Sequence, residues 1–213
     1  MQILVTASTE MEIAPFVNEN HETDILITGV GVPATLYQLS KRLHQVDYDL
    51  VVQAGICGSY GDNNFDKCLA VIEDTFADIG IYEANNFFSV FDMGFCDADT
   101  FPYQNGFLKN NNAIFNNCVF QKVRALTVNS VGENDKQETL LNRKYNAGIE
   151  TMEGAALHYV CLLEQVPFLQ LRAVSNRVGE RDKSKWKIKE AVLTVNNGLS
   201  QILEELKTGK LKI

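Results

Sequence analysis

The sequence is poor in the residues that build metal sites and disulfide frameworks. Its 213 residues include three histidines and five cysteines, and no C-x-x-C pair occurs. An odd number of cysteines without the spacing of zinc ligands favours reduced, buried thiols in a reducing compartment. There is no charged leader at the N-terminus, and no apolar run approaches the length of a membrane span, about 18 residues. We therefore expect a cytoplasmic protein without a metal site.

Positive charge is also scarce. The chain carries 19 Lys and Arg against 27 Asp and Glu, which gives a formal net charge of −8. Its basic residues are scattered apart from one short stretch between Lys183 and Lys189. An acidic protein without a basic face is a poor binder of nucleic acid and of anionic membranes. A small polar molecule is therefore the expected partner.

Several common catalytic and nucleotide-binding motifs are missing. No G-x-x-x-x-G-K-[ST] loop occurs, which argues against a P-loop nucleotidase, and neither G-x-S-x-G nor H-E-x-x-H is present. The segment 28–34, T-G-V-G-V-P-A, superficially matches a dinucleotide fingerprint. The match fails because the nearby acids, Asp47 and Asp49, precede the next predicted strand, where a ribose-binding acid would have to follow it. Pro33 also suits a helix start better than a pyrophosphate cradle.

What remains is an alternation of short β-branched runs with helix-length segments. Strands are expected at residues 2–6, 24–28, 49–53, 69–72, 119–128, 148–151 and 167–174, with a turn at 54–58. Helices are expected at residues 9–17, 34–44, 135–143, 153–163 and 185–206. This alternation predicts an α/β fold with a parallel or mixed sheet between helices, in one domain over residues 1–213. Residues 87–115 should form loops with short strands, and the asparagines at 85–86 and 110–112 should form exposed turns.

Four segments place polar or small residues just after predicted strands: Glu12, Gly55–Gly58, Glu153 and Asn176. Ligands of such sheets bind beyond the carboxyl ends of the strands, so these segments are expected to meet at one edge. A carboxylate at Glu12 could deprotonate a water, and one at Glu153 could accept hydrogen bonds from a ribose diol. Each residue also has an ordinary explanation, because acids suit the first turn of a helix and asparagine suits turns.

The order and spacing of these residues resemble the nucleoside phosphorylase/nucleosidase superfamily. The resemblance is carried by V-T-A-S-T-E-M-E-I-A-P near the N-terminus, by A-G-I-C-G-S-Y-G-D at 54–62, and by E-T-M-E-G-A-A-L-H-Y-V-C and V-P-F-L-Q-L-R-A-V-S-N-R between 149 and 186. It covers most of the chain and is weakest over residues 80–115. It implies a three-layer α/β sandwich with a central mixed β-sheet flanked by helices. It also implies a purine nucleoside as partner, no cofactor, and a homo-oligomer in which residues 87–107 could contact a neighbouring subunit's substrate.

Carried over residue by residue, the resemblance implies a role for each candidate. The water-activating glutamate of the superfamily falls on Glu12, and its purine-contacting position after the late strand falls on Asn176. Its ribose-binding Met-Glu pair falls on Met152 and Glu153.

The resemblance also implies two further parts of the binding site. The segment Gly55, Ile56, Cys57 and Gly58 would line the ribose and the reaction centre. The purine-stacking segment is expected near residues 128–132, and Val131 is the residue of this segment that we name as a candidate.

Asn176 separates the candidate activities. Adenine-specific nucleosidases of the superfamily resemble this chain but carry Asp at this position. Adenine presents a donor at N6, whereas a 6-oxopurine presents an acceptor at O6. Asn can donate to O6 and accept from a protonated N7, but a buried carboxylate facing O6 would set acceptor against acceptor, at a cost of about 1–3 kcal/mol. We therefore expect release of hypoxanthine, with an adenine-releasing nucleosidase as the alternative.

Two more activities fit the resemblance, a phosphorylase and a non-catalytic nucleoside-binding protein. Phosphorylases hold phosphate with arginines, whose planar fork matches the oxyanion. No arginine precedes Arg42, and none lies in the glycine segments 29–31 and 55–58. This pattern favours water over phosphate as the nucleophile. A binding protein would need Glu153 and Asn176 but would have no need for Glu12.

Overall fold

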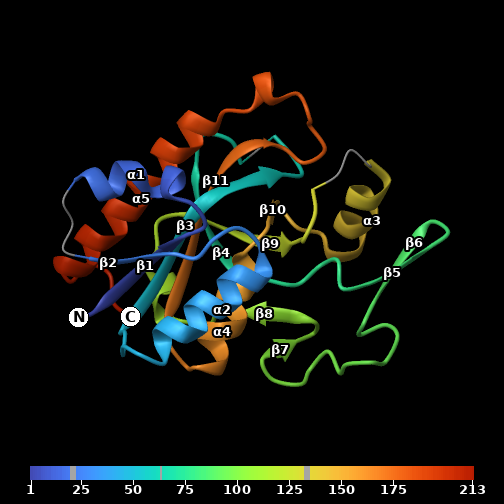
Figure 1. The fold of residues 1–213 in the computed structure, drawn as a ribbon, viewed down its shortest axis with the longest axis horizontal. Coiled ribbons are helices and arrows are strands. Elements are labelled where there is room, and N and C mark those ends of the chain that lie inside the picture. The colour runs from blue at the N-terminus through green and yellow to red at the C-terminus, as the bar shows by residue number, and fades with distance from the viewer. Residues whose placement is uncertain (20–22, 63, 132–134) are drawn as a thin grey trace.

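The computed structural model describes residues 1–19, 23–62, 64–131 and 135–213. In these ranges the chain forms an α/β sandwich in which a mixed sheet lies between two pairs of helices (Figure 1). Helices α1 (Glu10–Asn18) and α5 (Ile188–Lys207) cover one face, and α2 (Val32–Leu43) and α4 (Gly154–Leu163) cover the other. The predicted fold class is therefore confirmed.

Most predicted strands and helices form within about three residues of their expected bounds. The strands are β1 (Ile3–Ala7), β2 (Asp24–Ile27), β3 (Leu50–Ser59), β4 (Cys68–Asp74), β5 (Gly80–Glu83), β6 (Asn86–Ser89), β7 (Tyr103–Gln104), β8 (Phe107–Lys109), β9 (Gln121–Thr127), β10 (Ile149–Thr151) and β11 (Phe168–Arg177). The remaining helical segments are α3 (Asp135–Tyr145) and the short 3-10 helices η1 (Ala113–Asn116) and η2 (Lys183–Lys185).

The main sheet closes partly on itself around the long strand β3. β1 pairs in parallel with β2 and with the first half of β3. β3 also pairs in parallel with β11, which pairs antiparallel with β4. β4 pairs with β9, β9 pairs with β10, and β10 returns to the end of β3 at Glu150 and Gly58. The second half of β3 is therefore enclosed by strands on both sides.

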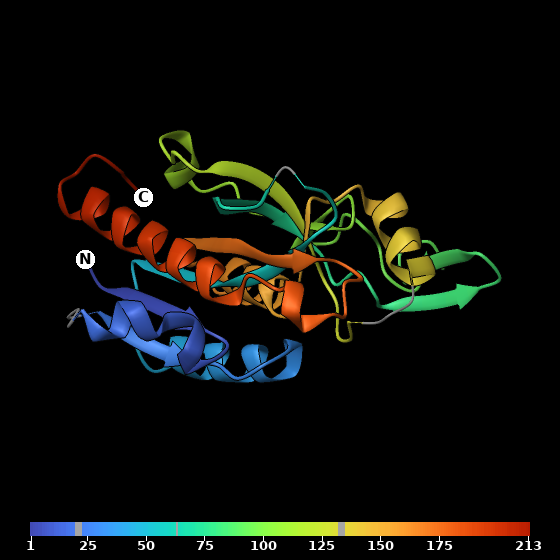
Figure 2. The ribbon, with the colours of Figure 1, turned by 90° about the horizontal axis from the view of Figure 1, so that it is seen from above.

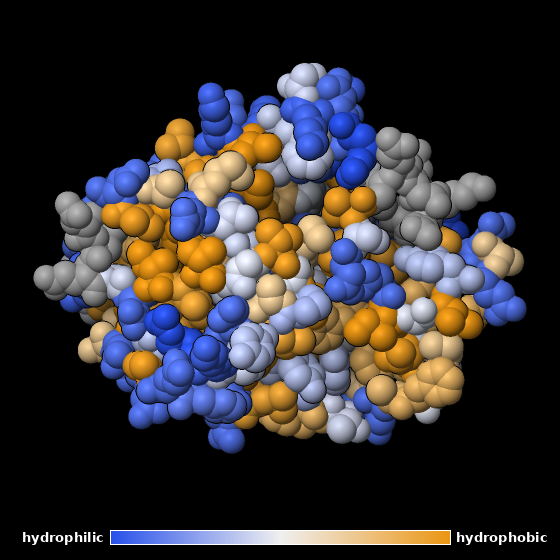
Figure 3. Space-filling model, in the orientation of Figure 1, coloured by the Kyte–Doolittle hydropathy of each residue, from blue (hydrophilic) through white to orange (hydrophobic). Residues whose placement is uncertain are grey.

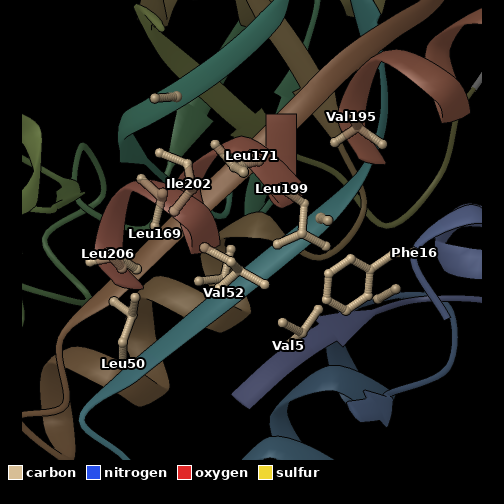
Figure 4. Packing of buried hydrophobic residues seen from close by; sticks show 14 of the residues in the cluster. Val5, Phe16, Leu50, Val52, Leu169, Leu171, Val195, Leu199, Ile202 and Leu206 are labelled. Carbon is tan, nitrogen blue, oxygen red and sulfur yellow. The ribbon is translucent and has the colours of Figure 1, made fainter. Parts of the chain in front are cut away.

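The core under α5 fixes β3 and β11 in place. Figure 4 shows Val195, Leu199, Ile202 and Leu206 of this helix packed over Val52, Leu169 and Leu171 of the sheet. These helix positions recur every three or four residues, which places them on one face of the helix. Burying each such side chain contributes about 1.5–3 kcal/mol, so the two strands that carry the candidate residues rest on a rigid layer.

Two details differ from the predictions. The turn predicted at residues 54–58 is wrong, because β3 continues through this segment to Ser59 and pairs there with β11 and β10. Glycines inside a strand mark a close approach of other groups, and the Arg172 side chain approaches Gly55 in this way. The exposed turn predicted at Asn110 is also wrong, because this side chain is buried and its Nδ2 donates to the Phe168 carbonyl at 2.7 Å.

The hairpin of β5 and β6 extends beyond the sandwich beside α3 (Figures 1 and 2). Within the described ranges, none of the helices combines the length and the hydropathy that crossing a membrane requires.

Candidate active site

A cavity of about 290 Å³ opens where β1, β3, β10 and β11 pass into the segments that follow them. Most of the predicted site residues line it: Glu12, Ile56, Cys57, Gly58, Val131, Met152, Glu153 and Asn176. Gly55 directly precedes Ile56 in β3 and lies against the Arg172 side chain. A larger hollow of about 780 Å³ lies at the opposite ends of β1 and β2, against α5, and its lining among the described residues includes none of the predicted site residues.

The Glu12 carboxylate is held in one orientation by three donors. Thr9 caps α1 and donates both its backbone N–H, at 3.1 Å, and its hydroxyl, at 2.9 Å, to Oε2. The backbone N–H of Ile56 in β3 donates to Oε1 at 3.1 Å. Glu12 is 6% exposed. The capping box that begins α1 therefore also aims a carboxylate across the pocket at β3.

Arg172 is a buried charged residue next to Gly55 and near Glu12 that the sequence analysis did not assign. It lies directly opposite Gly55 in the β11–β3 pairing and is fully buried. A Cβ on Gly55 would lie 2.1 Å from Arg172 Nη1 and 3.0 Å from Glu12 Oε1, so the guanidinium and the carboxylate occupy the space that this glycine leaves. Nη2 donates to Gln53 Oε1 at 2.5 Å, while Nη1 and Nε have no hydrogen-bond partner among the described residues.

The signal for Arg172 was present in the sequence. An arginine inside a mostly apolar strand that is covered on both faces must be paired or used. Its link to the site depends on the register that sets it opposite Gly55, and the sequence does not reveal that register.

Glu153 occupies the N-cap position of α4 and is 6% exposed. Its Oε1 accepts a hydrogen bond from the backbone N–H of Gly31 at 2.9 Å. Gly31 has φ +89°, in the left-handed region that favours glycine, and it is the N-cap of α2. The glycine segment that superficially resembled a dinucleotide fingerprint therefore serves to orient a carboxylate of this pocket.

Asn176 lies at a β-bulge near the end of β11. Val174 pairs with Cys57 and Asn176 pairs with Gly58, so Ser175 is the extra residue. The Ser175 hydroxyl donates to Asn176 Oδ1 at 2.7 Å, and Asn176 Nδ2 donates to the Arg177 carbonyl at 2.8 Å. A carbonyl can only accept, so these two contacts define which amide atom is the nitrogen. Bulges redirect side chains, and both Ser175 and Asn176 line the pocket.

The other predicted residues form the walls and the rim. Cys57 is buried, and burial raises the pKa of its thiol to about 12, so it stays protonated and unreactive near neutral pH. Val131 is exposed at the mouth, together with Met11 and Val30. Gly132, which ends the predicted purine-stacking segment, lies outside the described residues. Trp186 closes one side, and its Nε1 donates to the Glu180 carbonyl at 3.0 Å.

The described lining of the pocket presents carboxylates and an amide. In the part of the chain that the structure describes, no group of three or more His, Cys, Asp and Glu side chains could hold a metal ion. The arrangement offers a fixed carboxylate beside a guanidinium, a second carboxylate at a helix start, and an oriented amide. These groups can bind a polar molecule and activate a water.

Comparison with known proteins identifies the family of the chain. The sequence profile of the phosphorylase superfamily matches residues 16–207. The futalosine hydrolase of Streptomyces coelicolor is 29% identical over 194 residues, which are 88% of this chain and 81% of that protein.

Solved structures share the fold at low identity. The futalosine hydrolase of Helicobacter pylori superposes with a TM-score of 0.80 at 15% identity, covering 96% of this chain and 98% of the other. A 5′-methylthioadenosine/S-adenosylhomocysteine nucleosidase from S. pneumoniae gives a TM-score of 0.80 at 14% identity, covering 97% and 100%. Because the profile match spans most of the sequence, the chain belongs to the phosphorylase superfamily.

Proposed function

We propose that residues 1–213 form one nucleosidase domain that hydrolyses the N-glycosidic bond of futalosine and releases hypoxanthine, without a cofactor. The observation that carries this proposal is that one pocket holds both the fixed Glu12 carboxylate beside Arg172 and the oriented amide of Asn176. The futalosine hydrolases among the relatives support the choice of substrate.

The nucleophile is a water held between Glu12 and Arg172. Glu12 takes a proton from this water as the oxygen adds to C1′ of the ribose, and the bond between C1′ and the base breaks. The ribose passes through an oxocarbenium-like state, as in glycoside hydrolysis, and Glu153 accepts hydrogen bonds from its 2′ and 3′ hydroxyls. The electron pair of the broken bond leaves with the base, whose N7 takes a proton from solvent.

Asn176 selects the leaving base. One of its two N–H bonds is used by the Arg177 carbonyl, and the other can donate to O6 of hypoxanthine. Its Oδ1 accepts from Ser175 and has a second lone pair for a protonated N7. The Arg177 contact opposes a flipped amide, because Oδ1 would then face a backbone carbonyl that can only accept.

Water rather than phosphate is the proposed acceptor, although Arg172 lies near Glu12 and Arg181 lines the pocket. Arg172 enters from β11 against Gly55, and Gln53 already accepts one of its hydrogen bonds. The Glu12 carboxylate beside it would repel a phosphate dianion. A guanidinium that is already bonded to Gln53 and lies near a carboxylate is therefore a poor phosphate site and a good site for a neutral water.

Base release measured by chromatography tests this proposal. Purified wild-type chain and the Glu12→Gln variant would be incubated with futalosine, methylthioadenosine and inosine, each with and without phosphate. We expect hypoxanthine from futalosine, unaffected by phosphate, and a loss of about 10²–10⁴-fold in turnover for Glu12→Gln. Faster release of adenine from methylthioadenosine would favour an adenine-specific nucleosidase, and a requirement for phosphate would favour a phosphorylase.

The proposal includes a homodimer in the cytoplasm. Apolar side chains are exposed just before β5, on β5 and β6, and on the segment that follows: Ile79, Ile81, Tyr82, Phe88, Phe95 and Phe101. The hairpin of β5 and β6 lies at the right in Figure 1, and Figure 3 shows hydrophobic surface on this side of the molecule. Such patches mark association surfaces. Among the described residues that line the pocket, none comes from 87–107, so a second copy would have to bring this segment to it. Light scattering after size-exclusion chromatography should give twice the chain mass, and a monomer would refute the dimer.

A further inference from the structure

The first backbone N–H groups of α4 donate to side chains of the sheet rather than to the side chain of the N-cap residue. Glu153 makes no capping hydrogen bond, and its carboxylate turns to Gly31 instead. The N–H of Gly154 donates to Thr151 Oγ1 at 3.2 Å, and the N–H of Ala155 donates to Thr127 Oγ1 at 2.7 Å. Two threonines on neighbouring strands thus satisfy donors that an N-cap side chain usually serves, which leaves Glu153 available to the pocket.

A buried carboxylate stands behind these threonines. Thr127 Oγ1 donates to Asp74 Oδ1 at 3.0 Å, and the N–H of Thr75 donates to the same oxygen at 2.8 Å. Asp74 is fully buried at the end of β4, and its Oδ2 has no hydrogen-bond partner among the described residues. A negative charge at this position stabilises α4, because the N-terminus of a helix carries a partial positive charge.

Gly154 allows the helix to sit directly on this carboxylate. A Cβ at Gly154 would lie 2.2 Å from Asp74 Oδ2 and 2.1 Å from Gln170 Nε2. Any larger residue would push α4, and Glu153 with it, away from the sheet. The contact therefore couples the position of a pocket carboxylate to a group outside the pocket.

Asp74 also acts on the charge beside Glu12. Gln170 and Arg172 alternate along β11, so both point to the α4 face of the sheet. Burial raises the pKa of Asp74, whereas the hydrogen bonds from Thr127 and Thr75 and the Arg172 guanidinium each lower it. His158 of α4 lies over Gln170 and Arg172 on this face. Burial lowers the pKa of its ring to about 4, so the ring is neutral near pH 7.

We propose that Asp74, as a carboxylate, is a positioning residue for the nucleosidase site. Through Thr127 it holds the start of α4 and thereby Glu153, and it offsets the buried charge of Arg172, which faces Glu12. This inference rests on the proposed nucleosidase function. Asp74 would act on the pocket through its charge and its hydrogen bonds, without touching the substrate.

Burial raises the pKa of Asp74 to about 7, more than the opposing contacts lower it. The carboxylate is therefore present above this pH and is neutralised below it. Catalytic efficiency should rise as pH increases through this range. Asn does not ionise, so an Asp74→Asn variant stays neutral at every pH. The ratio of wild-type to variant kcat/KM should therefore rise as pH increases.

The experiment compares kcat/KM of wild type and Asp74→Asn across pH. We expect the variant to be roughly tenfold or more slower at about pH 8.5 and to approach wild type near about pH 5.5. The matched control is Glu73→Gln on the same strand, whose carboxylate pairs with Arg124 and should give a constant ratio. Thr127→Val keeps the charge but removes the hydroxyl, and it should lose activity at the higher pH. A purely structural role for Asp74 would give a ratio independent of pH and would overturn the proposal.

A second measurement needs no substrate. The unfolded pKa is near 3.8 and the folded pKa is higher, so the folded state binds the proton more tightly. The free energy of unfolding of wild type, relative to Asp74→Asn, should therefore fall as pH rises from about 4 to about 7 and then level off. A difference that keeps falling to about pH 9 would show that Asp74 stays neutral, against the proposal. If wild type released no base from any nucleoside, the proposed function would fail, while the unfolding series would still decide whether Asp74 ionises.

Discussion

Adding one methyl group to Gly55 is expected to disable the reaction centre without unfolding the chain. The new Cβ of Gly55→Ala would lie 2.1 Å from Arg172 Nη1 and 3.0 Å from Glu12 Oε1. Ordinary carbon contacts begin at about 3.4 Å, so the guanidinium must move by more than about 1 Å. Gln53 and Glu12 restrict the directions in which it can move.

The size of the effect follows from this displacement. A misplacement of about 1 Å in a reacting group can cost about 10²-fold in rate. At about 1.36 kcal/mol per tenfold, this corresponds to about 2.7 kcal/mol of lost transition-state stabilisation. Overpacking a core position costs about 1–3 kcal/mol of stability, which a domain of ordinary stability tolerates.

The assay is base release from futalosine, with kcat and KM determined separately and folding followed by thermal unfolding. The matched control is Gly61→Ala, because a Cβ at Gly61 would meet nothing within 4 Å. Gly61→Ala should retain wild-type kcat/KM. If Gly55→Ala also stayed within about threefold of wild type, the placement of Arg172 and Glu12 at the reaction centre would be wrong.

Three further predictions test other parts of the molecule. Asn176→Asp should raise the ratio of adenine to hypoxanthine release by about tenfold or more, and an unchanged ratio by chromatography would remove the basis for the base preference. Thr9→Ala should lower the free energy of unfolding by about 0.5–2 kcal/mol through the lost helix cap and should slow base release, because Thr9 also holds Glu12. Burial lowers the pKa of His158 to about 4, so the free energy of unfolding of wild type, relative to His158→Gln, should fall by about 3 kcal/mol as pH falls from about 6.5 to about 4. Urea unfolding of both chains measures this difference, and an identical pH dependence would show that His158 is not buried in its neutral form.

The sequence predicted the elements of the fold well because periodicity is local. Apolar residues in β11 and the three-to-four-residue spacing in α5 follow from the chain itself. The extension of β3 through Gly55–Gly58 was missed because glycines are read as turns when their partners are unknown. In the structure, β11 and β10 pair with this segment and keep it extended. Tertiary pairing overrides local propensity there.

The candidate site was recognisable only in part for the same reason. Glu12, Glu153 and Asn176 follow or end strands, and that position alone predicts that they share an edge of the sheet. Arg172 and Asp74 lie inside or at the end of strands whose neighbours are set by register. Their contact with Gly55 and Gly154 depends on groups more than 70 residues apart in the sequence coming within van der Waals range. No spacing rule reports such a contact.

The most direct test of the central claim is to follow wild-type turnover of futalosine in water labelled with a heavy oxygen isotope, with phosphate present. We expect free hypoxanthine to be released and the ribosyl product to carry the label at C1′, because the proposed nucleophile is a water held by Glu12 and Arg172. An unlabelled ribose phosphate, or an intact folded chain that leaves futalosine unchanged, would contradict this claim.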